Sequence, residues 1–136
     1  MGAVLLLSPD SVPPRVLVVD DVSVNRAMLV RLLAAVGFVV AEAENGEQAV
    51  EVAQAWLPDA VLMDLQMPLL DGLGATRAIK RASWGAAIAV IIVSGSSREA
   101  NVADALAAGA FGFISKPFLD AEILAALGGA LGLVYG

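Results

Sequence analysis

The sequence predicts an α/β protein built on a doubly wound parallel sheet of five strands with five helices. Short runs of apolar, often β-branched residues alternate strictly with segments of helical periodicity. This order is typical of a parallel sheet that carries helices on both faces and has right-handed crossovers. The strand-like runs contain almost no polar residue, as expected of strands that are buried on both faces.

The bulk composition fits one folded domain. The chain has 136 residues, of which 59% are hydrophobic and 16% are charged, so a sizeable core is expected and a disordered chain is excluded. The net charge of −6 argues against nucleic acid as a partner, because phosphate binding needs a basic face. The absence of Cys and His excludes disulfides, thiolate metal sites and a histidine base. Apolar runs are too short for a membrane span, so a cytoplasmic protein without direct membrane contact is expected.

Residues 1–14 are predicted to be a linker or tail that precedes the domain at 15–136. Three prolines, Pro9, Pro13 and Pro14, stiffen and extend the backbone here. The apolar run before them is too short for a signal peptide. It is left open whether this run ends an upstream domain, forms a dimer contact or is vector sequence.

The first half of the domain contains two predicted strand–helix pairs. Arg15–Val19 is a β-branched run that predicts the first strand, and helical periodicity follows at 24–36. A short strand at 38–41 leads to a second helix, which Asn45 caps and Pro58 ends. The apolar residues expected near one face of the first helix are Val24, Met28, Leu32 and Val36.

Three further strand–helix pairs are predicted in the second half. Ser96 and Glu99 have the spacing of a capping box, which marks the start of the fourth helix. The predicted strands are 60–63, 88–93 and 111–114, and the predicted helices are 73–81, 96–108 and 119–131.

Polar residues stand at the carboxyl ends of four predicted strands, where open parallel sheets bind ligands. They are Asp20 and Asp21, Asp64, Ser94 and Lys116. Taken singly, each has an ordinary structural explanation as a helix cap, a turn residue, a hydrogen-bonding strand end or a surface charge. Their combined placement at one edge predicts a functional site.

The charges of this set indicate its chemistry. Three aspartates and one lysine carry a formal charge of −2, and close carboxylates repel each other unless a cation lies among them. An all-oxygen ligand set favours Mg²⁺ as that cation. Aspartate is also a covalent acceptor of phosphoryl groups, so Asp64 is a candidate acceptor, with Ser94 as a donor to a phosphoryl oxygen.

The motifs at these positions resemble those of the receiver domain of bacterial two-component response regulators, over about residues 15–131. The resemblance implies a flavodoxin-like strand order of 2-1-3-4-5. The matching segments are Val-Leu-Val-Val-Asp-Asp at 16–21, Asn-Gly-Glu-Gln-Ala at 45–49, Leu-Met-Asp-Leu-Gln-Met-Pro at 62–68 with Asp-Gly at 71–72, Ile-Ile-Val-Ser at 91–94, and Ser-Lys-Pro-Phe at 115–118.

The resemblance implies the role of each acidic residue. Asp64 would take a phosphoryl group from a phospho-histidine on a histidine kinase or a histidine phosphotransfer domain. Asp21 would bind Mg²⁺ directly, and Asp20 would bind it directly or through water. The carboxylate of Asp64 and the backbone carbonyl of Gln66 would complete the protein ligands.

The resemblance also implies a conformational switch. Ser94 would be the hydroxyl that moves towards the phosphoryl group, with Lys116 as its ion-pair partner and Gly95 leaving room for it. Phe113 stands where the family carries its switch aromatic, although a tyrosine is commoner there. The Lys116–Pro117 bond would be a cis peptide.

The expected context is a receiver from a hybrid sensor histidine kinase. Val-Asn-Arg at 24–26 and Asp-Leu-Gln-Met-Pro at 64–68 are similar to such receivers, the proline-rich start fits a tether to a kinase domain, and no output domain follows Gly136. A stand-alone single-domain regulator is the alternative. The isolated domain is not expected to be an enzyme, beyond accepting a phosphoryl group and slowly losing it, and homodimerisation is left open.

The sequence disfavours three other classes of protein. An aspartyl-nucleophile phosphatase usually needs a second acid two residues after the nucleophile, and this chain has Gln66 there. A nucleotide- or flavin-binding domain needs a glycine-rich turn after its first strand, where this chain has Asp20 and Asp21. A pseudo-receiver that serves only as a protein contact is disfavoured by the complete acidic set.

Overall fold

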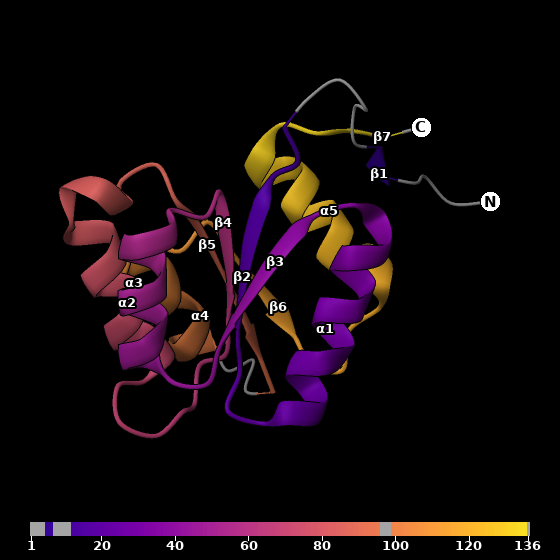
Figure 1. The fold of residues 1–136 in the computed structure, drawn as a ribbon. Coiled ribbons are helices and arrows are strands. Elements are labelled where there is room, and N and C mark those ends of the chain that lie inside the picture. The colour runs from indigo at the N-terminus through magenta and orange to yellow at the C-terminus, as the bar shows by residue number, and fades with distance from the viewer. Residues whose placement is uncertain (1–4, 7–11, 96–98, 136) are drawn as a thin grey trace.

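A computed structural model describes residues 5–6, 12–95 and 99–135 of the chain. Within these residues, five parallel strands form one sheet in the order β3-β2-β4-β5-β6 (Figure 1). Counted within that sheet, the order is 2-1-3-4-5, so the predicted fold class and topology are confirmed. The strands are β2 (Arg15–Val19), β3 (Val39–Ala43), β4 (Ala60–Met63), β5 (Ala89–Ser94) and β6 (Gly112–Ser115).

Helices cover both faces of this sheet. Helices α1 and α5 lie on one face, and α2, α3 and α4 lie on the other (Figure 1). A short 3-10 helix, η1, precedes β5. The bounds are α1 (Ser23–Val36), α2 (Gly46–Trp56), α3 (Gly72–Arg81), η1 (Ser83–Gly85), α4 (Glu99–Ala107) and α5 (Asp120–Leu131).

The pleat of the buried strands divides the core into two layers. In β2, Val16 and Val18 pack towards α1 and α5, whereas Leu17 and Val19 pack towards α2, α3 and α4. Every residue of β4 is buried. The sequence therefore has to supply continuous apolar runs for the central strands, which leaves polar groups to the strand ends.

The predicted apolar face of the first helix is wrong for Val24 and Met28, whereas Leu32 and Val36 pack against the core as expected. Leu29 and Leu33 are the buried residues of α1, while Val24 is exposed and Met28 is 60% exposed. Apolar residues occur nearly all round this helix, so periodicity alone does not define the side that meets the sheet. Met28 therefore contributes an apolar side chain to the surface.

Two predictions concern the chain outside the main sheet. Leu5–Leu6 (β1) pairs antiparallel with Val134–Tyr135 (β7), a pairing that was not predicted. That residues 1–14 form a linker or tail stays a prediction. The proposed capping box depends on Ser96, which lies outside the described residues.

In the described ranges, no helix is long and apolar enough to cross a membrane.

Gly72 packs directly against the backbone of Asp64, with no room for a side chain between them. A methyl group added at Gly72 would overlap the carbonyl oxygen of Asp64, whereas one added at Gly129 would make only ordinary contact with a phenyl ring. Gly72→Ala is therefore expected to lower the free energy of unfolding by about 1–3 kcal/mol. Gly129→Ala, within α5, is expected to leave it unchanged or raise it. Urea denaturation measures both, and equal losses would contradict the steric argument.

Candidate functional site

Three aspartate side chains meet at the carboxyl edge of the sheet. Asp20 and Asp21 follow β2, Asp64 follows β4, and these two strands are neighbours with Val19 opposite Met63. The amide of Asp64 donates to the carbonyl of Val19 at 3.0 Å, which continues the sheet to the acceptor residue. In the described part of the chain, ligand oxygens of Asp20, Asp21 and Asp64 lie within 4.8 Å of one another. The predicted convergence of the carboxylates is therefore present.

Lys116 reaches this cluster from the end of β6. Its Nζ lies 3.0 Å from Oδ2 of Asp20 and 3.8 Å from Oδ1 of Asp64. The amide of Lys116 donates to the carbonyl of Ser94 at 2.8 Å, so β5 and β6 hold its backbone. The peptide bond from Lys116 to Pro117 is cis, as predicted. One ammonium thus bridges two of the three carboxylates.

Asp20 is buried and hydrogen-bonded by several groups, whereas its neighbour Asp21 is exposed. The Asp20 residue is only 1% exposed. Its Oδ1 accepts from the amide of Val22 at 2.9 Å, and its carbonyl accepts from Nη1 of Arg26 at 2.7 Å. Sequence reasoning missed Arg26, which no motif marked as part of the site.

The carboxyl group of Asp64 is poised between burial and solvent. Its side chain is 12% exposed. Burial raises the pKa of Asp64 above the ordinary value of 3.8, and the charges of Asp20 and Asp21 raise it further. Lys116 and the backbone amide of Leu65 act in the opposite direction but do not cancel the rise. A cation among the carboxylates would therefore favour the ionised form of Asp64.

The ligand set fits Mg²⁺. Three carboxylates supply oxygen ligands close enough for one small cation, and Mg²⁺ prefers a few carboxylate oxygens with water in the other positions. Lys116 neutralises only part of the negative charge. The exposure of Asp21 leaves one side of the cluster open to solvent.

Comparison with known proteins decides the family. A family model for the response regulator receiver domain matches residues 16–128, which is most of the chain. The chain belongs to this family. The receiver domain also resembles the chemotaxis protein CheY of Bacillus subtilis (strain 168), with 45% identity over 114 residues that cover 83% of this chain and 93% of that protein.

Two solved receiver structures are similar to this receiver. One is the receiver domain of a sensor histidine kinase from Pseudomonas aeruginosa PAO1, solved with a magnesium ion coordinated in its active site cleft. It has a TM-score of 0.83 and 31% identity, over 89% of this chain and 99% of that one. The other is a CheX–CheY complex with BeF3 and Mg²⁺ from Borrelia burgdorferi, with a TM-score of 0.83 and 30% identity, over 88% of this chain and 90% of that one.

The remaining predicted site residues of the receiver belong to β5, to β6 and to the segments that follow β4 and β5. Ser94 is buried at the end of β5, and Gly95 is exposed next to it, with open space where a side chain would stand. Phe113 of β6 is half-buried and packs against the core layer under α2, α3 and α4. Gln66 is exposed in the loop after β4. The roles predicted for these residues as switch, phosphoryl or metal contacts stay predictions.

The raised pKa of Asp64 predicts a pH-dependent stability of the metal-free receiver. Below pH 3.8 the carboxyl is protonated in both the folded and the unfolded states, so Asp64 costs nothing. As the pH rises through 3.8, the unfolded state loses its proton first, and the penalty is complete above the raised folded pKa. Asp64→Asn is therefore expected to stabilise the receiver at neutral pH, and to do so less at low pH.

Urea denaturation in the presence of a chelator measures this difference at both pH values. Adding Mg²⁺ at neutral pH is expected to stabilise the wild type more than Asp64→Asn, because the cation favours the ionised carboxylate. A stabilisation by Asp64→Asn that is the same at low and neutral pH would contradict the assignment to ionisation.

Proposed function

We propose that this receiver accepts a phosphoryl group on Asp64 from a phospho-histidine, with Mg²⁺ as cofactor. The observation that carries the proposal is the position of the Asp64 carboxylate beside Asp20, Asp21 and Lys116 at the open edge of the sheet. An oxygen of Asp64 forms a bond to phosphorus while the N–P bond breaks, and the imidazole leaves with that electron pair. When bound, Mg²⁺ supplies positive charge that lowers the repulsion between the carboxylate and the phosphoryl oxygens.

The side chains of this receiver divide the remaining tasks. Lys116 already lies 3.8 Å from Oδ1 of Asp64, where its ammonium can pair with an oxygen of the transferred group. Ser94 at the end of β5 is the proposed donor to another of these oxygens. Phosphorylation then biases the proposed switch of Ser94 and Phe113. The magnesium ions in the two similar receiver structures support the choice of cofactor.

Incubation with acetyl phosphate, followed by intact-mass measurement, tests this proposal. The wild type is expected to gain one phosphoryl group when Mg²⁺ is present and to gain far less in a chelator. An adduct that forms equally without Mg²⁺ would exclude the proposed role of the metal. Absence of any adduct on folded protein would exclude the proposed function.

Exposed apolar side chains around the acidic cluster support a protein as the phosphoryl donor. We name them the apolar rim: Val22, Val24, Met28, Leu69 and Leu119. They come from the connections after β2, β4 and β6 and from the first turns of α1, all at the edge that holds Asp64. A hollow lined by Met28, Pro117 and Phe118 opens beside Asp20 and Lys116. Exposed apolar side chains that gather at one edge of a protein are typical of a protein docking surface.

A pair of substitutions in the apolar rim separates docking from chemistry. Met28→Ser combined with Leu119→Ser is expected to slow transfer from a phosphorylated histidine phosphotransfer protein by about tenfold. Phosphorylation by acetyl phosphate is expected to stay unchanged, because neither side chain contacts Asp64. Leu57→Ser, at the opposite edge of the sheet, is the control. Equal slowing with both donors would contradict a docking role.

The wider context belongs to the same proposal. Resemblance to a hybrid-kinase receiver favours a phosphorelay within a larger kinase, whereas the similarity to CheY supports a stand-alone regulator equally well. In either case the receiver is proposed to work in the cytoplasm, as a switch without turnover of other substrates. The sequence of the complete gene distinguishes the two contexts, because a kinase domain upstream would identify the hybrid.

A further inference from the structure

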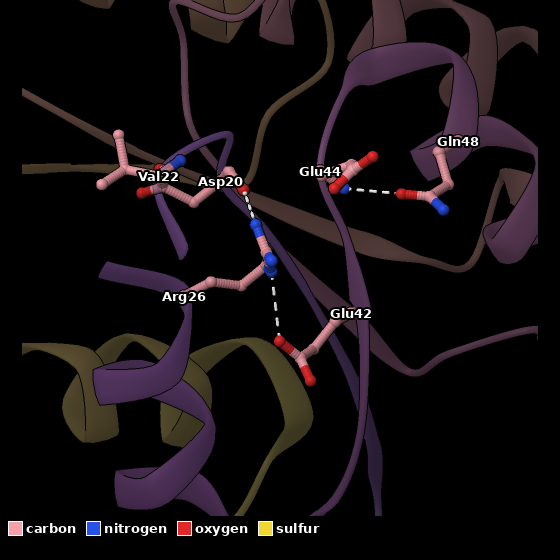
Figure 2. A network of polar contacts seen from close by, with 6 residues as sticks. All are labelled: Asp20, Val22, Arg26, Glu42, Glu44 and Gln48. Atoms are coloured by element: carbon pink, nitrogen blue, oxygen red, sulfur yellow. Dashed lines mark hydrogen bonds and ion pairs between the residues drawn. The ribbon is translucent and has the colours of Figure 1, made fainter. Parts of the chain in front are cut away.

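Arg26 joins the acidic cluster to the neighbouring strand through a pair of contacts. Its Nη1 donates to the backbone carbonyl of Asp20 at 2.7 Å, and its Nε lies 3.1 Å from Oε1 of Glu42 on β3 (Figure 2). The Arg26 side chain is only 16% exposed. The planar guanidinium therefore links the residue after β2 to a residue of β3.

Helix stability does not explain an arginine at this position. Arg26 lies near the N-terminus of α1, where a cation opposes the helix dipole. Val22 supplies no side-chain cap, and the first turn of α1 contains no acidic residue that would balance the charge. The contacts of Arg26 with Asp20 and Glu42 are therefore the reason for its placement that the structure shows.

These contacts complete the fixation of Asp20. Its Oδ2 is held by Lys116, its Oδ1 by the amide of Val22, and its carbonyl by Arg26. A fixed carbonyl sets the plane of the peptide that follows, and therefore the direction in which Asp21 leaves the strand. Without Arg26, the turn that carries both aspartates would have one anchor fewer.

We propose that Arg26 is a positioning residue, which acts through the backbone of Asp20 to preorganise Asp20 and Asp21 for Mg²⁺. This inference rests on the proposed function, because it concerns the same metal site. Partners beyond the direct ligands commonly change metal affinity by about tenfold or more when they are removed. No contact between Arg26 and the metal is required.

Because Arg26 pairs with Glu42, its effect on the position of the metal ligands can be separated from the effect of its charge on Mg²⁺ binding. Arg26→Gln alone removes a positive charge near the cluster, which by Coulomb attraction would strengthen cation binding. Lost positioning would weaken it, so the two effects have opposite signs. Arg26→Gln combined with Glu42→Gln leaves the net charge unchanged and isolates the loss of the anchor.

Isothermal titration with Mg²⁺ on wild type and variants tests the inference. Arg26→Gln/Glu42→Gln is expected to bind Mg²⁺ about tenfold more weakly than the wild type. Its Val22 amide resonance is expected to shift in the metal-free spectrum, because that amide donates to Asp20. Glu44→Gln is the charge control. Glu44 lines the same hollow as Arg26. Its backbone amide donates to the side chain of Gln48 and is not part of the contacts between Arg26, Asp20 and Glu42 (Figure 2).

The possible results distinguish the inference from the function. A wild type that fails to bind Mg²⁺ would overturn both the proposed function and this inference. A wild type that binds, with a double variant of equal affinity and an unchanged Val22 resonance, would overturn the inference alone. Arg26→Met/Glu42→Gln keeps the alkyl stem of the arginine packed, and answers the same question in case the glutamine pair does not fold.

Discussion

Lys116→Met is expected to destabilise the metal-free receiver by about 3 kcal/mol, because it leaves the buried carboxylate of Asp20 without its cation. The ammonium lies 3.0 Å from that carboxylate and 3.8 Å from Asp64, so its removal also exposes the two carboxylates to mutual repulsion. Methionine keeps the apolar stem of the side chain, which limits the change to the charge. Urea denaturation at neutral pH in a chelator measures the loss.

Two further variants separate the charge from other effects of this substitution. Adding Asp20→Asn to Lys116→Met is expected to recover part of the stability, because the unpaired buried charge is then absent. Arg77→Gln, at an exposed position of α3, removes a cation elsewhere and is expected to change stability by less than about 0.5 kcal/mol. A loss for Lys116→Met no larger than that for Arg77→Gln would refute the argument.

Asp64→Asn is expected to abolish phosphoryl acceptance, because an amide is a far weaker nucleophile than the carboxylate it replaces. The variant keeps the shape of the site, so its folding and Mg²⁺-dependent stability can be compared with those of the wild type. Intact-mass measurement after incubation with acetyl phosphate and Mg²⁺ reads the result. Asp104→Asn, an exposed acid on α4, is the matched control and is expected to react like the wild type.

Asp21→Asn distinguishes the acceptor from the metal ligands. It retains Asp64 and removes one carboxylate from the cluster. Its adduct is expected to form more slowly and to need a Mg²⁺ concentration about tenfold higher or more. An adduct that survives in Asp64→Asn but disappears in Asp21→Asn would show that Asp64 is not the phosphoryl acceptor.

The positions of the site residues at strand ends explain why the site could be predicted from the sequence. Asp20, Asp64 and Lys116 each follow an apolar run that can be read as a buried strand, and parallel strands bring such ends to one edge. Chain alternation thus predicted that residues 20 and 116 lie at the same edge of the sheet, although no local signal links them. The same alternation predicted a parallel, doubly wound sheet, whereas the strand order 2-1-3-4-5 was implied by the resemblance to the receiver family.

Other features depend on packing that a single sequence does not encode locally. Leu29 and Leu33 were not distinguished from Met28, because α1 is apolar almost all round and only the sheet selects its buried side. Asp20 and Asp21 are chemically identical in the sequence, yet one is buried against Lys116 and the other is exposed. Arg26 was missed because its partner Glu42 lies on another strand, past the predicted end of that strand.

Reductive trapping of the phosphorylated receiver tests the central claim most directly. Borohydride reduces an acyl phosphate to an alcohol, so a phosphorylated aspartate becomes homoserine, which peptide mass spectrometry can locate. After incubation with acetyl phosphate and Mg²⁺, homoserine is expected at position 64, and far less of it is expected when Mg²⁺ is chelated. Homoserine at position 20 or 21, or no homoserine at all in folded protein, would contradict the assignment of Asp64 as the phosphoryl acceptor.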